Sequence, residues 1–408
     1  FGSGNLTGGS NTAIGREASF SNTSGQHNVA LGQSANYAIT TGGYNVGVGS
    51  QALRFNTTAS NNTAVGYQSL YTNVTGADNT AFGAYSLYSN TTGTRNVGVG
   101  KQALLAATTG NDNVAVGFVA ADSLTTASNT TAIGSWALAG NTTGANNTGI
   151  GYRALYLNTT ASNNTAVGHG AVYSNTTGAG NTGIGGEAGL SLTTSSYNTA
   201  LGFRALKLTT TASNNTAVGT FALQANTTGA SNVAVGGYSL LSNTTASYNT
   251  ALGYQASLNA TTGAVNTFVG GLSAGLGVVT GSHNVGLGAE TLYRLTSGGS
   301  NVSIGYQALQ FNTTGSSNIA IGREALENNT TASNNTAVGY QAGYSTTTGG
   351  ENSYFGRFSG KGVTTGTGNV FLGARAGNYQ IPTTTGSYNT VIGSYSKVGN
   401  AGDSNAVA

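Results

Sequence analysis

Acidic side chains are the first candidates for chemistry in this 408-residue chain, because two neighbouring carboxylates can act as general acid and general base. The chain holds only ten Asp and Glu residues. Four of them lie two residues after the glycine of a recurring pattern, N-x-[A/G]-[apolar]-G: Glu17, Glu187, Glu290 and Glu324. Other copies of the pattern carry Gln, Arg, Tyr or Trp at this position. Such variation predicts a solvated face, and we expect no catalytic residue and no enzymatic activity.

The histidines and aspartates do not support a metal site. His27 and His283 occupy the same repeat position many repeats apart, and His169 occupies a different one, so the three imidazoles cannot share an ion. Calcium-binding solenoids place Asp at a fixed repeat position, whereas the Asp residues of this chain form no such series. We therefore expect neither a metal nor a cofactor.

Recurring Asn-x-Thr sequons offer a different chemistry, the attachment of an N-linked glycan. They stand in one polar column of the repeat, which predicts that they face solvent. The alternative is that Asn and Thr are present because they suit turns and ladders. The candidate asparagines are Asn56, Asn90, Asn141, Asn158, Asn175, Asn226, Asn243 and Asn312.

Composition restricts the partners of the chain. Charged residues make up 6% and the net charge is +3, whereas ordinary soluble domains carry roughly 25% charged residues. The few basic residues are scattered, which argues against nucleic-acid binding. No run of about 18 apolar residues is present, so no membrane span is expected. Cysteine is absent, and with it any disulfide framework.

A strict repeat organises the whole chain. The glycines of the pattern fall at 15, 32, 49 and onward to 393, and 20 of the 22 intervals are 17 residues long. One interval is 18 residues and one is 20. Coils that stack on identical coils tolerate few changes of length, so we expect corner insertions near 271–287 and 374–392.

The repeat columns predict which side chains face inward. The residue before the glycine is apolar in all 23 repeats, for example Ile14, Val48 and Ile150, and we expect it to form an inward aliphatic stack. Replacing Ile150 with Asp should then cost several kcal/mol. The position three residues after the glycine is Ala or Ser with one Thr, which indicates close packing. The leading Asn should form a hydrogen-bonded ladder, and the glycine should supply a corner conformation. The Thr or Ser nine residues after the glycine suits an edge ladder.

Frequent glycine and the absence of 3.6-residue periodicity exclude helix. Short strands separated by Gly and Asn turns fit the pattern. The sequence therefore predicts an all-β fold, a parallel β-solenoid of about 23–24 coils of 17 residues, as one continuous domain over residues 1–408.

The segments Asn62–Leu70, Asn301–Leu309 and Asn318–Leu326 carry a family resemblance. They resemble the N-S-x-A-[apolar]-G head repeats of trimeric autotransporter adhesins. They are also similar to the NTAIGYQAL and NTTG repeats of phage tail-fibre-like and bacterial surface proteins. The resemblance implies a left-handed β-roll in a homotrimeric fibre exposed outside the cell or virion, where it contacts a host-cell or glycan surface.

The two ends read as halves of one coil, Asn405-Ala406-Val407-Ala408 and Phe1-Gly2. Because bare strand edges can pair with another chain, we expect a fibre subunit that assembles with itself, head to tail through these ends or by lateral packing. A segment of a longer repeat protein is the alternative for the ends. A trimeric adhesin or tail-fibre shaft, and an ice-binding solenoid with a Thr array, are the alternatives for function.

Overall fold

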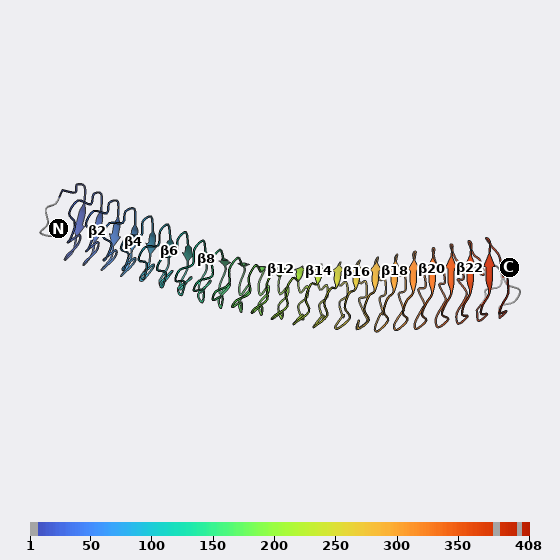
Figure 1. Ribbon diagram of the computed structural model, residues 1–408. Coiled ribbons are helices and arrows are strands. Elements are labelled where there is room, and N and C mark those ends of the chain that lie inside the picture. The colour runs from blue at the N-terminus through green and yellow to red at the C-terminus, as the bar shows by residue number, and fades with distance from the viewer. Residues whose placement is uncertain (1–6, 378–383, 398–401) are drawn as a thin grey trace. The chain divides into compact units, whose positions relative to one another are not determined.

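The computed structural model describes residues 7–377, 384–397 and 402–408. The chain divides into two compact units, Phe1–Phe203 (unit 1) and Arg204–Ala408 (unit 2), which are considered separately. All regular structure in the described residues is β-strand, in 23 strands of three residues each, and these residues contain no helix. Each 17-residue coil contributes one strand, and turns form the remainder (Figure 1).

The strands of unit 1 are β1 (Thr12–Ile14), β2 (Val29–Leu31), β3 (Val46–Val48), β4 (Thr63–Val65), β5 (Thr80–Phe82), β6 (Val97–Val99), β7 (Val114–Val116), β8 (Thr131–Ile133), β9 (Thr148–Ile150), β10 (Thr165–Val167), β11 (Thr182–Ile184) and β12 (Thr199–Leu201). Those of unit 2 are β13 (Thr216–Val218), β14 (Val233–Val235), β15 (Thr250–Leu252), β16 (Thr267–Val269), β17 (Val285–Leu287), β18 (Val302–Ile304), β19 (Ile319–Ile321), β20 (Thr336–Val338), β21 (Ser353–Phe355), β22 (Val370–Leu372) and β23 (Thr390–Ile392).

Within each unit, every strand pairs in parallel with the next strand along the chain. In β9 and β10, for example, Thr148 lies opposite Thr165 and Ile150 opposite Val167, a shift of one coil. The longer intervals do not disturb this register. β16 pairs with β17 across 18 residues, and β22 pairs with β23 across 20. The predicted parallel β-solenoid is therefore confirmed. The additional residue of the 18-residue interval lies in the turns between β16 and β17, whereas the predicted insertion near 374–392 includes residues 378–383, which lie outside the described residues.

The glycine after each strand forms the corner of the coil. Its φ lies between about +121° and +139° in every coil, a region that side-chain-bearing residues rarely adopt. The backbone of the next coil is also very close, since a Cβ on Gly66 would lie 2.6 Å from the carbonyl carbon of Gly83. Both facts confirm the predicted role of this glycine.

The face of each strand that is buried is opposite to the face that the sequence predicted. The central residue of each strand, Ala or Gly in most coils, is buried from β2 onward, whereas the first and third residues face outward. Ile14, Phe82 and Ile392 are 63%, 55% and 60% exposed, and Ile150 is half-buried. The prediction of an inward aliphatic stack is therefore wrong. In most coils the thin interior leaves room opposite the strand only for a small side chain. The exceptions include Tyr354 and Phe371, which are completely buried at the centres of β21 and β22.

A different apolar column fills the interior. Four residues after the corner glycine stands a Leu in most coils, as at Leu53, Leu70 and Leu104, and its side chain is completely buried. These leucines have φ near +50° to +55°, a conformation that costs an ordinary residue roughly 1–2 kcal/mol. Burying a Leu side chain contributes about 1.5–3 kcal/mol and offsets that cost. The small column three residues after the glycine, including Ala52 and Ser69, is also buried from Ala18 to Ala376, as expected for a closely packed position.

Candidate functional site

The leading asparagines form the predicted ladder. From Asn28 to Asn389 these asparagines are buried, and the N–H of Asn62 donates to Oδ1 of Asn45 in the preceding coil (3.0 Å). The side-chain amide of Asn62 donates to the carbonyl of Gly76 in the next coil (2.9 Å). The ladder therefore runs mainly from side chain to backbone. It joins successive coils and contributes cohesion within each unit.

The sequon asparagines do not face solvent, so that part of the glycosylation prediction is wrong. Asn56 is completely buried, and its amide donates to the carbonyl of Ala59 (3.1 Å) within its own turn. The amide of Asn158 donates to Oδ1 of Asn141 (2.9 Å) and to Ala161 (3.0 Å). An oligosaccharide cannot attach to amides held in this way in the folded chain. The same burial applies to Asn90, Asn175, Asn226, Asn243 and Asn312.

The Thr residues of the turns divide into two columns. Thr57 and Thr91 donate from Oγ1 to carbonyls of the next coil (3.1 Å each). The following residues, Thr58 and Thr92, belong to the column that the sequence singled out, and they are exposed. The hydrogen-bonded Thr ladder therefore lies one residue earlier than the column expected to form it.

The candidate end residues are described only in part. Phe1 and Gly2 lie outside the described residues. Asn405 to Ala408 follow β23 as the start of a further coil, with a parallel bridge between Thr390 and Val407. The N–H of Thr390 donates to Ala406 (2.8 Å), and that of Ile392 donates to Ala408 (2.8 Å). Completion of this coil by a second copy stays a prediction.

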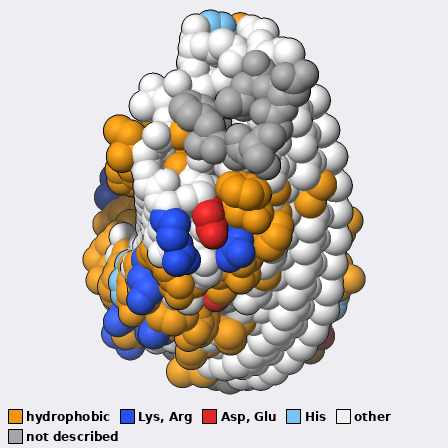
Figure 2. All heavy atoms as spheres, turned by 90° about the vertical axis from the view of Figure 1, so that its left-hand side faces the viewer, with side chains coloured by type: hydrophobic (Ala, Val, Ile, Leu, Met, Phe, Trp, Pro, Cys, Tyr) orange, Lys and Arg blue, Asp and Glu red, His pale blue; other side chains and the backbone are white. Residues whose placement is uncertain are grey.

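The four glutamates of one column are not brought together as a pair. Glu17 is exposed, and Glu187 and Glu290 are half-buried. Glu324 is buried, contrary to the predicted solvated face, because it accepts hydrogen bonds from the amide of Gln341 and from Arg323 Nε. These two hydrogen bonds lower the pKa of the Glu324 carboxyl, and the bond from Gln341 has the larger effect. Charged side chains lie among hydrophobic ones on one flank of the unit 1 coils nearest the viewer in Figure 2.

The histidines are also separate. His27 stacks on Tyr44, and His169 stacks on Tyr152, with ring centroids 4.9 and 5.5 Å apart. Among the described residues, no group of three His, Asp or Glu side chains is placed to hold a metal ion. The same part of the chain has no helix of the length and apolarity needed to cross a membrane.

The most extensive candidate site is the outward surface of the strands, which we call the strand face. It consists of the first and third residues of each strand. The third residue is Val, Ile, Leu or Phe in all 23 strands. The first is Thr in thirteen, Val in eight, and Ile or Ser in the other two. In each unit the strand face therefore presents an uncharged, largely apolar surface to solvent, and surfaces of this kind mark interaction sites.

Sequence reasoning recognised the column of third strand residues but assigned it to the core, and it did not single out the column of first strand residues. The signal that could have corrected this is the two-residue periodicity of a strand. In Thr-Ala-Val, the outer two residues must share a face, and only the small central one fits inside a thin coil. The Leu column, which does fill the interior, was visible as an apolar position in most repeats.

No known protein-family model matches this chain, and no curated protein matches it.

Proposed function

We propose that this chain is a structural subunit of an extracellular fibre and that its copies assemble side by side through their strand faces. The observation that carries the proposal is the outward apolar column, which is exposed or half-buried in the strands of both units. Covering apolar surface is the dominant favourable term in most protein association. Within each unit the column recurs in every strand, which favours a partner that extends along the stacked coils.

A second copy of the same chain fits the strand face best. Side chains on this face recur once per coil, at a spacing of about 4.8 Å. A partner must present the same spacing if its side chains are to interdigitate over many coils, and another copy does so. None of the 23 strands carries a charged residue at an outward position, so two strand faces meet without burying unpaired charge.

The location outside the cell and the number of copies rest on the resemblance of the repeats to adhesin heads and tail-fibre-like proteins. That resemblance favours three copies. A host-cell or glycan surface is the contact that it implies for the assembled fibre.

Sedimentation velocity tests the assembly. We expect the wild-type chain to sediment as an oligomer and a triple variant, Ile133→Lys, Ile150→Lys and Val167→Lys, to sediment as a monomer. A matched triple variant places the same three charges in the column two residues after the corner glycine, at Gln51, Gln68 and Gln102, and should remain oligomeric. A wild-type monomer at all concentrations, or equal dissociation of both variants, would contradict the proposal.

Ice binding is the second candidate function, and the strand face is the surface that would contact ice. Thirteen of the 23 strands pair an outward Thr with an outward apolar residue, repeated once per coil. Such a regular, uncharged surface can order water. Thermal hysteresis and faceted ice crystals at concentrations where the chain is monomeric would support this function. Round crystals without hysteresis would exclude it.

A further inference from the structure

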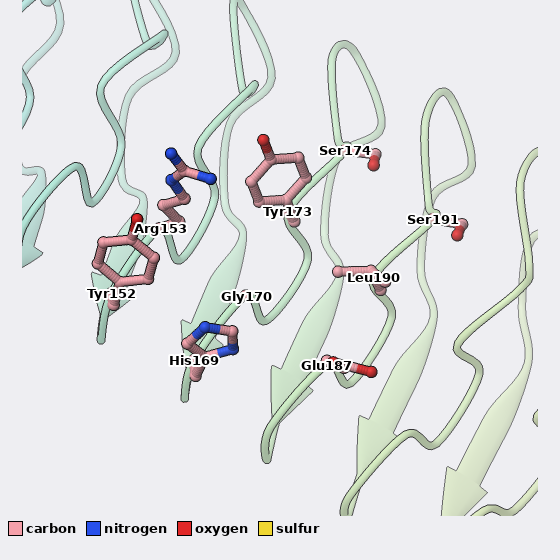
Figure 3. A pocket seen from close by; sticks show the side chains of 9 residues that line it. All are labelled: Tyr152, Arg153, His169, Gly170, Tyr173, Ser174, Glu187, Leu190 and Ser191. Carbon is pink, nitrogen blue, oxygen red and sulfur yellow. The ribbon is translucent and has the colours of Figure 1, made fainter.

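A recess of about 310 Å³ opens in unit 1 beside Gly170 (Figure 3). Position 170 belongs to the column two residues after the corner glycine, between Arg153 and Glu187 in the neighbouring coils. Gly170, Arg153 and Glu187 have nearly the same backbone conformation, with φ of +60°, +55° and +56° respectively. The missing side chain at Gly170 therefore opens the recess without a change in the path of the chain.

One wall of the recess is aromatic and carries a fixed cation. The guanidinium of Arg153 lies 5.1 Å from the ring centroid of Tyr152 and 5.4 Å from that of Tyr156. His169 stacks on Tyr152, and Tyr173 stacks on Tyr156 at 5.2 Å. This arrangement holds the Arg153 side chain in place through cation–π contacts. Its Nε–H is buried and has no hydrogen-bond partner among the described residues.

The opposite wall supplies complementary groups. Figure 3 shows the carboxylate of Glu187 and the hydroxyl of Ser191 on the coil that follows the coil of Gly170, with the apolar side chain of Leu190 between them. The recess thus combines aromatic faces, a donor-rich cation, a carboxylate acceptor and hydroxyl groups. One positive and one negative side chain line it, which disfavours a polyanion such as nucleic acid.

We propose that this recess binds a pyranose residue of an uncharged glycan. The C–H face of a sugar ring suits the negatively polarised face of an aromatic ring, and its hydroxyls suit both Arg153 donors and a carboxylate acceptor. The volume lies at the lower end of the range for small-molecule sites. None of the lining residues belongs to a strand, so the site does not depend on assembly through the strand face.

The variant Gly170→Gln tests the site by filling the recess. Its backbone is already compatible, because Gln51, Gln68 and Gln102 occupy the same column with φ of +60°, +53° and +62°. A Cβ at Gly170 would meet only Leu190 Cδ1 at 3.5 Å. Glu17→Gln, in the same column of a distant coil, serves as the control. Tyr152→Ala is a second variant that removes the stacking surface and leaves the recess open.

Binding is measured on a neutral glycan array and then by titration with glucose, galactose, mannose, fucose and N-acetylglucosamine as free sugars. We expect at least one of these to bind the wild-type chain and the Glu17→Gln control equally. Gly170→Gln and Tyr152→Ala should each weaken that binding at least tenfold while melting temperatures stay unchanged. Binding to the array alone would show that the site needs a glycan chain. Binding of a free sugar would show that a single sugar unit suffices. No binding to either, or binding that survives Gly170→Gln, would overturn the proposal.

Discussion

The ring of Tyr354 lies against Gly360 and occupies the space that a buried leucine side chain fills in other coils of unit 2. Position 360 belongs to the buried Leu column, which includes Leu309 and Leu326, but here it is glycine. A Cβ on Gly360 would overlap the Tyr354 ring, and one on Gly343 would lie 2.6 Å from Tyr354 Cδ2. The large inward residue and the missing leucine are therefore two halves of one packing arrangement.

This complementarity predicts a non-additive double mutant. Tyr354→Ala should destabilise the protein by about 3–5 kcal/mol, because it leaves a cavity. Gly360→Leu alone should also destabilise it, by about 1–3 kcal/mol, because the core becomes overpacked. Together the two changes recreate the side-chain pattern of an ordinary coil, so the double variant should recover at least about 1 kcal/mol relative to the sum. Denaturant unfolding measures all three, and strictly additive losses would show that the two sites do not share one space.

Two adjacent glycines should differ sharply in their tolerance of a side chain. Gly236 is a corner glycine with φ of +129°, and a Cβ there would lie 2.6 Å from the carbonyl carbon of Gly253. At Gly237 the nearest atom would be Tyr254 Cδ2 at an ordinary 3.5 Å. We expect Gly236→Ala to cost at least about 2 kcal/mol and Gly237→Ala to change stability by less than about 0.5 kcal/mol. Similar thermal unfolding of the two variants would refute the assigned corner geometry.

Glu327 should make stability depend on pH. Burial raises the pKa of its carboxyl, with a further contribution from Glu324, and its Oε2 has no hydrogen-bond partner among the described residues. A folded-state pKa above the unfolded value favours the protonated form. The stability that the protonated Glu327 carboxyl contributes is fully present below the ordinary glutamate pKa of 4.5. It is lost as the pH rises through the pKa of the folded state.

Glu327→Gln should therefore be more stable than the wild type at pH 7, and this advantage should shrink as the pH falls toward 4. Melting curves across this range measure the effect. Glu351→Gln, at an exposed position of the same unit, is the control and should show little difference. An advantage that grows on acidification would contradict the assignment.

The repeat made most of the fold predictable. Its constant length requires stacked coils in register, and the corner glycines and the Asn ladder follow from their fixed positions. The inside and outside of the strand were not resolved, because Ile150 and Leu53 both belong to apolar columns and only the thin interior decides between them. The burial of Asn56 was missed for a related reason, since polar side chains in a turn were assumed to face water. The recess at Gly170 could not be predicted, because its walls come from columns whose neighbours in space are known only from the structure.

The corrected orientation gives opposite predictions for two neighbouring coils. Ala166, at the centre of β10, is completely buried, whereas Ile150, at the end of β9, faces outward. Ala166→Asp should cost about 3–5 kcal/mol, because it buries an unpaired charge. In dissociated chains at low concentration, Ile150→Asp should cost less than about 0.5 kcal/mol. If Ile150→Asp proved as destabilising as Ala166→Asp under these conditions, the outward placement would be wrong.

Coverage of the strand face by a second copy can be measured directly by the reactivity of single cysteines. The chain contains no native Cys, so Ile150→Cys and Gln102→Cys each provide one thiol at a position that is half-buried in the single chain. In the assembled protein, we predict that a maleimide reagent modifies the thiol at 150 at least tenfold more slowly than the thiol at 102. On dilution to monomers, the two rates should converge. Equal rates at assembly concentrations would contradict the account.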